Sequence, residues 1–215
     1  MPHSLRHAWT SSVTALDYET HMAAIGQAQA NALHIADFLA RISPPPAARV
    51  LIAGAGTGQM FTVVPPGIFD GLRPVFSDIN PAFLACLRQR VPGAPCVADD
   101  LEHSALRGPF FAAAAVLVLE HIDWRKGLDT LARLALAHLF LVIQSNPPHI
   151  ATAVSPHRTL PGTMAAFSSS HPNLMHKPEV LAHLATLGYD LAQEDPRPVA
   201  DGKVMLGLSF RGCCP

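Results

Sequence analysis

Three glycines spaced two residues apart follow a short apolar run and form the clearest candidate for a ligand-binding turn. Residues 50–53 are all apolar, which is typical of a buried strand in a parallel sheet, and Gly54, Gly56 and Gly58 come directly after them. Glycine lets the backbone turn sharply and leaves no Cβ between the main chain and a bound group. A helix that begins after such a turn presents free N–H groups, which favour negative charge. We therefore expect this turn to hold a cofactor that contains a nucleoside.

Acidic residues end the next two predicted strands. Asp78 closes a strand predicted at 74–77, and Asp99 closes one predicted at 95–98. A carboxylate at the end of the second strand can accept hydrogen bonds from both ribose hydroxyls of a nucleoside. Proteins that bind nicotinamide adenine dinucleotide (NAD) and proteins that bind S-adenosylmethionine (SAM) share this arrangement. The dinucleotide fingerprint GxGxxG requires a glycine where this chain has Gln59, so the spacing favours SAM.

Histidines are the candidate general bases for a reaction on a small acceptor. His121 follows the fourth predicted strand and is expected to face the cofactor cleft, whereas His171 and His176 lie in a long loop-like segment. A positioned base contributes on the order of 10²–10⁴ in rate where the acceptor must lose a proton. Packing or hydrogen bonding is the alternative role for His121. There is no HExxH motif and no CxxC spacing, so we expect no metal site.

The elements that must position these residues alternate along the chain. Apolar residues at helical spacing predict a long helix at 12–42, which three prolines end. Strands are predicted at 50–53, 74–77, 95–98, 110–119, 138–144, 190–194 and 203–210, and further helices at 59–64, 81–91, 124–137 and 177–187. Asp201-Gly202 is expected to turn the last two strands into a hairpin. The order predicts an α/β, doubly wound fold with a mostly parallel, seven-stranded sheet and an antiparallel C-terminal strand.

The chain is expected to divide into two parts. Residues 1–46 are predicted to form an N-terminal helical cap, and residues 47–215 the cofactor-binding α/β domain. The segment at about 147–176 is rich in Pro, Ser and His and is too long for a plain connection, so we expect it to cover the substrate. Aromatic residues that could wall the acceptor pocket are Trp9, Tyr18, Trp124 and Phe167.

Four stretches resemble the motifs of the class I SAM-dependent methyltransferases. They are RVLIAGAGTG, PVFSDINPAFL, CVADDLE and VLVLEHIDW, in the order and with the gaps of that family, and the resemblance covers about residues 47–211. It implies a Rossmann-like methyltransferase fold and an enzyme that transfers a methyl group from SAM to a small-molecule acceptor at oxygen or nitrogen. The residues that it implies for cofactor binding in these motifs are Gly54, Ala55, Gly56, Gly58, Asp78, Ile79, Asp99, Asp100, Leu119 and Glu120.

The N-terminal stretch ALDYETHMAAIGQAQANAL is similar to the opening of the malonyl-carrier-protein methyltransferases and related small-molecule enzymes. That similarity implies that Tyr18 and Gln27 help to hold the methionine end of SAM. One departure lies in the first motif, where the family usually has Asp or Glu two residues before the first glycine and this chain has Ile52. The departure leaves an alternative open, namely a methyltransferase-like protein that binds SAM or a partner without methyl transfer.

Composition narrows the classes of partner. The formal net charge is −1 and there is no run of Lys or Arg, so we expect no nucleic-acid partner. No apolar stretch reaches the length of a membrane span and the N-terminus lacks an apolar secretory segment, so we expect a cytoplasmic protein. Charged residues make up only 14% of the chain, which leaves apolar surface for a homodimer.

Overall fold

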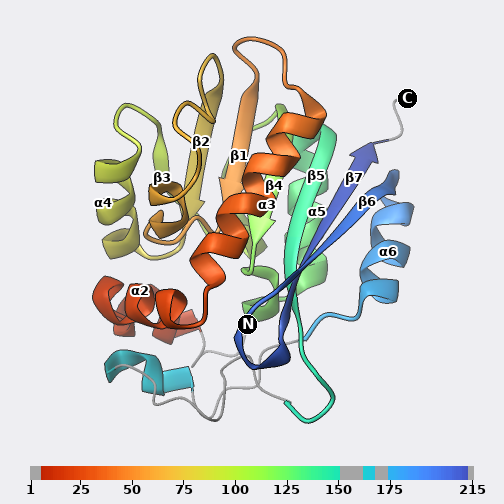
Figure 1. Ribbon diagram of the computed structural model, residues 1–215. Helices are drawn as coiled ribbons and strands as arrows, with labels where there is room; N and C mark the ends of the chain where they lie inside the picture. Colours follow the sequence, from red (N-terminus) through yellow and green to blue (C-terminus); the bar gives the residue numbers. More distant parts are fainter. Residues whose placement is uncertain (1–5, 151–161, 168–173, 213–215) are drawn as a thin grey trace.

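A seven-stranded sheet organises the computed structural model, which describes residues 6–150, 162–167 and 174–212 (Figure 1). The strand order is β3-β2-β1-β4-β5-β7-β6. Every neighbouring pair from β3 to β5 is parallel, and β7 is antiparallel to both β5 and β6. The strands are β1 Arg49–Ala53, β2 Arg73–Asp78, β3 Cys96–Ala98, β4 Phe110–Val116, β5 Ala135–Ser145, β6 Tyr189–Pro198 and β7 Val204–Gly212. The predicted doubly wound sheet with one antiparallel strand is confirmed.

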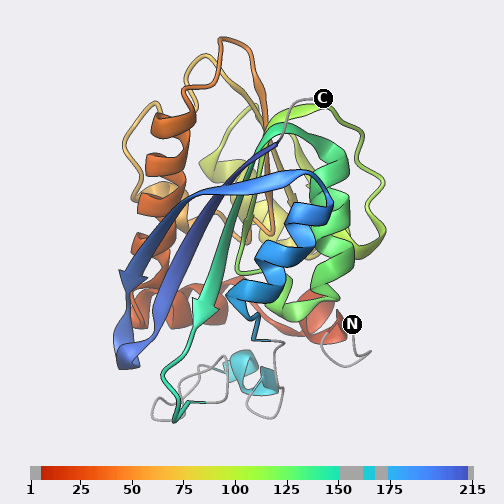
Figure 2. The same cartoon turned by 90° about the vertical axis from the view of Figure 1, so that its right-hand side faces the viewer.

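Helices cover both faces of this sheet. They are α2 Ala15–Ala24, α3 Gln27–Ile42, α4 Pro81–Arg90, α5 Trp124–Leu134 and α6 Lys177–Thr186. Short helical turns are η1 Ala8–Ser12, η2 Gln59–Thr62, η3 Leu101–His103, η4 Leu119–His121, η5 Gly162–Phe167 and η6 Ala200–Gly202. In Figure 2, α3 lies on one side of the sheet and α5 and α6 lie on the other. No helix in the described part of the chain is both long and apolar enough to cross a membrane.

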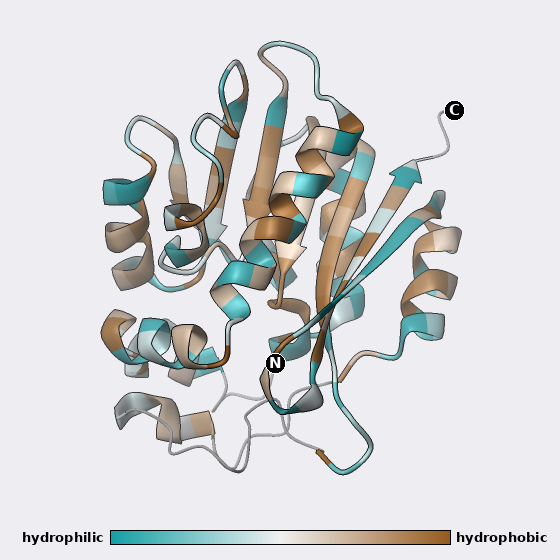
Figure 3. Ribbon diagram, viewed as in Figure 1, coloured by the Kyte–Doolittle hydropathy of each residue, from teal (hydrophilic) through white to brown (hydrophobic). Residues whose placement is uncertain are grey.

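Two apolar clusters, one on each face, hold the layers together. Alternate residues of a strand point to opposite faces, so Leu51 packs with α5 and α6 while Ile52 packs with α3 and α4. Figure 3 shows the resulting hydrophobic colour along β1 and β5, whereas hydrophilic and hydrophobic colours alternate along the helices. Burial on both faces explains why these strands read as apolar runs without alternation.

The N-terminal helix predicted at 12–42 is two helices. Gly26 has a φ of 72° between α2 and α3, a left-handed conformation that glycine adopts without steric cost and that a continuous helix excludes. As a result α2 turns away from α3 and lies near the carboxyl ends of the parallel strands (Figure 1). The helix predicted at 59–64 is only the short 3₁₀ turn η2.

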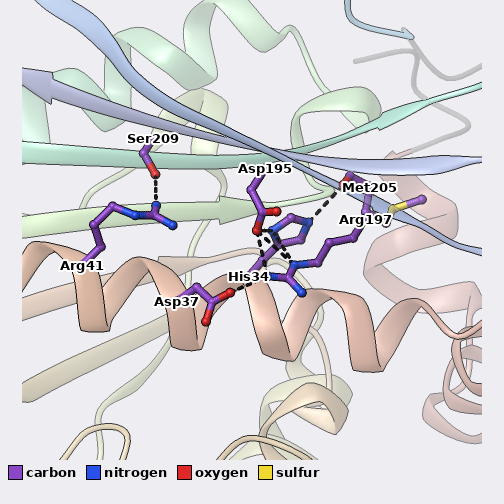
Figure 4. Close-up of polar contacts among 7 residues, drawn as sticks. All are labelled: His34, Asp37, Arg41, Asp195, Arg197, Met205 and Ser209. Carbon is purple, nitrogen blue, oxygen red and sulfur yellow. Dashed lines mark hydrogen bonds and ion pairs between the residues drawn. The ribbon is translucent and has the colours of Figure 1, made fainter.

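A polar cluster fastens α3 to the C-terminal hairpin (Figure 4). His34 Nε2 donates to the carbonyl oxygen of Met205 at 3.0 Å, so its Nδ1 is free to accept from Arg197 Nε at 3.4 Å. Arg197 also donates to Asp195 at 2.8 Å and pairs with Asp37 of α3. Burial lowers the pKa of His34, which keeps the ring neutral in this arrangement. The cluster joins segments that are far apart in the chain.

Candidate active site

A cavity lies at the carboxyl ends of β1, β2, β3 and β4, and α2, the start of α3, η1 and η5 also contribute to it. This is the end of a parallel sheet at which ligands bind in doubly wound folds. Of the residues that the sequence assigned to a cofactor or to catalysis, the cavity wall contains Tyr18, Gln27, Gly54, Ala55, Gly56, Asp78, Ile79, Asp99, Asp100, Glu120 and His121.

The glycine turn closes the cavity at the end of β1. Gly54, Gly56 and Gly58 have φ values of 66°, 59° and 75°, in the left-handed region that favours glycine. A Cβ on Gly54 would stand 2.6 Å from the Cβ of Val118, and one on Gly56 would stand 3.0 Å from the Tyr18 hydroxyl. Glycine is therefore required both by the backbone conformation and by the closeness of the surrounding side chains.

Asp78 is fixed at the end of β2 by two main-chain donors. Gly56 N donates to its Oδ2 at 2.8 Å, and Asn80 N donates to its Oδ1 at 2.9 Å. Burial raises the pKa of Asp78, and these two hydrogen bonds oppose that effect. Each carboxylate oxygen retains a second lone pair, so the side chain is held in place with acceptor capacity toward the cavity.

Asp99 and Asp100 follow β3 and differ in their partners. Asp99 Oδ1 accepts from Ala105 N at 3.1 Å, while its buried Oδ2 has no hydrogen-bond partner among the described residues. Asp100 pairs with Arg6 at 2.6 Å. Burial acts to raise the pKa of Asp100, but hydrogen bonds from His103 and Glu102 and the charge of Arg6 lower it overall.

The segment after β4 presents two titratable groups to the cavity, of which Glu120 is buried and His121 is half-buried. Glu120 Oε1 accepts from Gln144 N at 2.8 Å, and burial raises the pKa of Glu120 to about 7. Burial lowers the pKa of His121 to about 4, because no charged partner offsets the loss of hydration. His121 is therefore neutral at pH 7. Its Nδ1 is buried and has no hydrogen-bond partner in the described structure.

Aromatic side chains gather beside His121. Its ring centroid lies 4.9 Å from that of Trp9, and Trp9 lies 4.5 Å from Phe167. Tyr18 lies 4.9 Å from Phe83, a residue of α4 that the sequence analysis did not single out. All five residues border the cavity. The other predicted aromatic, Trp124, instead packs in the cluster between the sheet and α5.

The N-terminal segment reaches this site through three polar attachments. Asn80 Nδ2 donates to the carbonyl oxygen of Trp9 at 2.9 Å. Arg90 of α4 donates to Glu19 of α2 at 2.6 and 3.1 Å. Asp17 of α2 accepts from both the main chain and the hydroxyl of Thr163 in η5, at 2.8 and 2.6 Å. These contacts hold η1, α2 and η5 against the carboxyl end of the sheet.

Some predicted site residues lie elsewhere. Leu119 turns into the apolar cluster under α5, and Gly58 is needed for packing because an added Cβ would stand 2.4 Å from Leu87. Neither residue borders the cavity. His176 is exposed at the start of α6 and away from the cavity wall, and His171 lies outside the described residues. Within the described ranges, no group of three His, Cys, Asp or Glu side chains could hold a metal ion.

Polar residues that the sequence analysis passed over complete the cavity. They are His21, Asn31 and Gln144, which are buried. Asn31 stands four residues after Gln27, so both side chains lie on the same face of α3. That spacing was a usable signal for Asn31. His21 and Gln144 could not be found in this way, since their place in the wall depends on how α2 and β5 pack.

No protein-family model matches the chain, and no curated protein matches it. Solved structures do. The magnesium protoporphyrin IX methyltransferase ChlM from Synechocystis PCC 6803 with bound S-adenosylhomocysteine (SAH) superposes with a TM-score of 0.66 at 16% identity, covering 86% of this chain and 82% of ChlM. The N-methyltransferase NodS from Bradyrhizobium japonicum WM9 in complex with SAH gives 0.60 at 15% identity, covering 86% and 85%.

A third structure contains a second bound molecule besides SAH. The 1,6-didemethyltoxoflavin-N1-methyltransferase from Burkholderia thailandensis, with 1,6-didemethyltoxoflavin and SAH bound, gives a TM-score of 0.60 at 18% identity and covers 83% of this chain and 76% of its own. The strand order and the antiparallel β7 agree with this likeness, which extends over most of each chain. The chain therefore has the Rossmann-like fold of the class I SAM-dependent methyltransferases.

Proposed function

We propose that this protein is an enzyme that binds SAM and transfers its methyl group to a small-molecule acceptor at oxygen or nitrogen. The observation that carries the proposal is the position of Asp78. Its carboxylate is held by Gly56 N and Asn80 N at the edge of a cavity that the glycine turn also borders. The solved structures of similar fold support it, since those compared above contain SAH.

Different residues of the cavity wall would contact different parts of SAM. Asp78 would accept from the ribose hydroxyls, and Asp99, whose buried Oδ2 is unpaired within the described structure, would accept from the adenine amino group. Tyr18 and Gln27 would hold the methionine end. When bound, SAM supplies a methyl group already activated by the positive sulfonium. The protein then contributes mainly orientation, worth up to about 7–11 kcal/mol in favourable cases.

His121 is the candidate base for the acceptor. An acceptor that takes the methyl group from SAM would have to lose a proton where it reacts as a hydroxyl or an N–H group. The neutral His121 ring, with an unpaired Nδ1 among the described residues, can accept a hydrogen bond or that proton. The rings of Trp9, Phe83 and Phe167 would exclude water from the acceptor.

Further proposals concern the surroundings of the site. We propose that residues 1–46 act as the cap of the site and that the segment at about 147–176 covers the acceptor. A cytoplasmic location agrees with Cys86 and Cys96, which are free thiols. The homodimer stays a prediction, which light scattering on the eluting protein would check.

The test is calorimetric titration of the purified protein with SAM and with SAH. Asp78→Ala should weaken SAH at least about 100-fold, because it removes two charge-assisted hydrogen bonds worth roughly 1.5–3 kcal/mol each. Asp70→Ala is the matched control, since Asp70 is exposed and does not border the cavity. Absence of heat with either nucleoside on the wild-type protein would refute the proposal. If the protein binds SAM but transfers no methyl group to any acceptor that is tested, it is instead a methyltransferase-like protein that binds SAM without methyl transfer.

A further inference from the structure

Four buried acceptor oxygens in the cavity wall have no hydrogen-bond partner among the described residues, namely Oε1 of Gln59, Oδ2 of Asp99, Oδ1 of Asn31 and Oε2 of Glu120. The last two belong to Asn31 and Glu120. Both residues are only 3% exposed. Buried polar atoms in native proteins are nearly always paired, so each unpaired acceptor calls for an explanation. A bound group that donates hydrogen bonds to both oxygens would supply it.

The hydrogen bond made by Oε1 of Glu120 holds the unpaired Oε2 of the same carboxylate in place. Glu120 Oε1 accepts from Gln144 N at 2.8 Å, in the last part of β5. That hydrogen bond fixes the carboxylate plane and leaves Oε2 to the cavity. A carboxylate is an acceptor only, so its best partner is a cationic N–H donor.

Asn31 reaches the same cavity from α3. It lies on the buried face of α3 one turn after Gln27, and both side chains border the cavity. The amide Oδ1 adds a second acceptor without adding charge. The wall therefore offers one carboxylate oxygen and one amide oxygen, a combination suited to a primary ammonium group, which has three donors.

Strand β1 provides no acidic side chain that could pair with a ligand ammonium group. Ile52 of β1 is fully buried in the apolar cluster beneath α3. Any counter-charge to a ligand ammonium near α3 must come from another element, and Glu120 is a buried carboxyl that the segment after β4 directs to the cavity.

We propose that Asn31 and Glu120 bind the α-ammonium group at the methionine end of the cofactor. This inference rests on the proposed function, because it assumes that SAM and SAH occupy the cavity. Both residues act as ligand-binding residues, and neither takes part in moving the methyl group. Glu120, which follows β4, would then provide the negative charge that β1 does not provide.

The experiment compares SAH with 5′-methylthioadenosine, which has the same nucleoside and sulfur but no amino-acid end. Glu120→Gln and Asn31→Leu are close in size to the native side chains. The first removes the negative charge and replaces one carboxylate oxygen by an NH2 donor, and the second removes the amide oxygen. Each variant should weaken SAH at least about 10-fold in calorimetry and change the affinity for 5′-methylthioadenosine less than about 2-fold. Asp78→Ala is the contrasting control and should weaken both ligands, since both contain the ribose.

A ligand variant makes the test independent of folding. The desamino analogue of SAH keeps the carboxylate and lacks only the ammonium, so the wild-type protein should bind it at least about 10-fold more weakly than SAH. Equal affinity for the two, or equal losses of SAH and 5′-methylthioadenosine in the Glu120 and Asn31 variants, overturns the inference and leaves the proposed function standing. If the wild-type protein binds none of the three nucleosides, the proposed function fails and the inference fails with it.

Discussion

Glu120 and His121 are neighbours in the chain, and burial shifts their pKa values in opposite directions until their order is reversed. Burial raises that of Glu120 to about 7 and lowers that of His121 to about 4, since both groups lose hydration of their charged forms. Near pH 7 the histidine is uncharged and the carboxyl is close to half ionised. A cationic ligand would favour the ionised carboxyl, whereas an empty cavity favours low charge.

Replacing His121 should change how stability depends on pH. The pKa of His121 is lower in the folded protein than in the unfolded chain. Its contribution to the free energy of unfolding is therefore fully present above about pH 6.5 and is lost as pH falls toward 4. Between pH 7.5 and pH 5 this loss amounts to about 2 kcal/mol. His121→Leu should not show it, and urea unfolding at both pH values measures the difference.

The comparison of variant with wild type removes the opposing effect of Glu120. Its raised pKa gives stability below about pH 4.5 that is lost as pH rises through 7, and this applies to both proteins. An unchanged difference between His121→Leu and wild type at the two pH values would contradict the burial of a neutral His121.

At the residue scale, the sequence predicted best the positions of side chains that lie at or just after the end of a strand. Asp78, Asp99 and Glu120 border the cavity because parallel strands bring their carboxyl ends to one edge. Their roles with the cofactor stay predictions. Leu119 was expected at the site but faces the core, because the turn η4 points its side chain toward α5. Asn31 was missed since an asparagine inside a helix does not by itself indicate burial.

At the scale of single elements, the glycine turn provides a stability prediction. Gly58→Ala forces a residue with a Cβ into a φ of 75° and places that Cβ 2.4 Å from Leu87 Cδ1. The left-handed conformation costs about 1–2 kcal/mol and overpacking about 1–3 kcal/mol more. We expect a total loss of about 2–5 kcal/mol in the free energy of unfolding, measured with urea.

Gly71→Ala separates the two costs of this substitution. Gly71 has a φ of 73° and nothing within 4 Å of an added Cβ, so only the conformational cost of about 1–2 kcal/mol should remain. If Gly58→Ala is no more destabilising than Gly71→Ala, the contact with Leu87 relaxes freely and the packing argument is wrong.

Element boundaries were predictable where a capping residue marks them. Asn80 accepts from Ala82 N and Phe83 N ahead of Pro81, as expected for an N-cap followed by proline, and α4 begins there. The break at Gly26 was missed, because apolar residues continue at helical spacing on both sides of it. The strand predicted at 110–119 ends at Val116, since Leu117 takes a φ of 53°.

At the scale of the whole molecule, the polar cluster of Figure 4 should stabilise the attachment of the last hairpin to α3. Arg197 is 22% exposed and contacts Asp195, Asp37 and His34, so Arg197→Ala removes several partly buried contacts at once. We expect a loss of about 1–3 kcal/mol in the free energy of unfolding.

Lys126→Ala is the control for the loss of an ordinary surface charge. Its ion pair with Asp123 spans 3.8 Å and both side chains are well exposed, so its loss should cost less than about 0.5 kcal/mol. Similar losses in the two variants would show that the Arg197 cluster behaves as a surface ion pair.

The topology of the sheet was predictable because it depends on patterns that a single sequence carries. Alternating elements and a final hairpin predicted a mostly parallel sheet, and the positive φ values of Asp201 and Gly202 agree with the predicted turn. The docking of η1, α2 and η5 over the cavity was not predictable, because it depends on isolated polar contacts between distant residues.

The attachments of the N-terminal segment have a consequence for the order of folding. Trp9 and Glu19 each bond to residues 71 positions later, and Asp17 bonds to one 146 positions later. During synthesis the segment leaves the ribosome before its anchoring partners at α4 and η5, which follow only after long delays. Bringing together residues so far apart in the chain costs conformational entropy, and the contact offsets this cost only once it has formed. The N-terminal segment is thus among the last parts of the fold to be secured, and we expect the candidate active site to be completed only after the sheet beneath it.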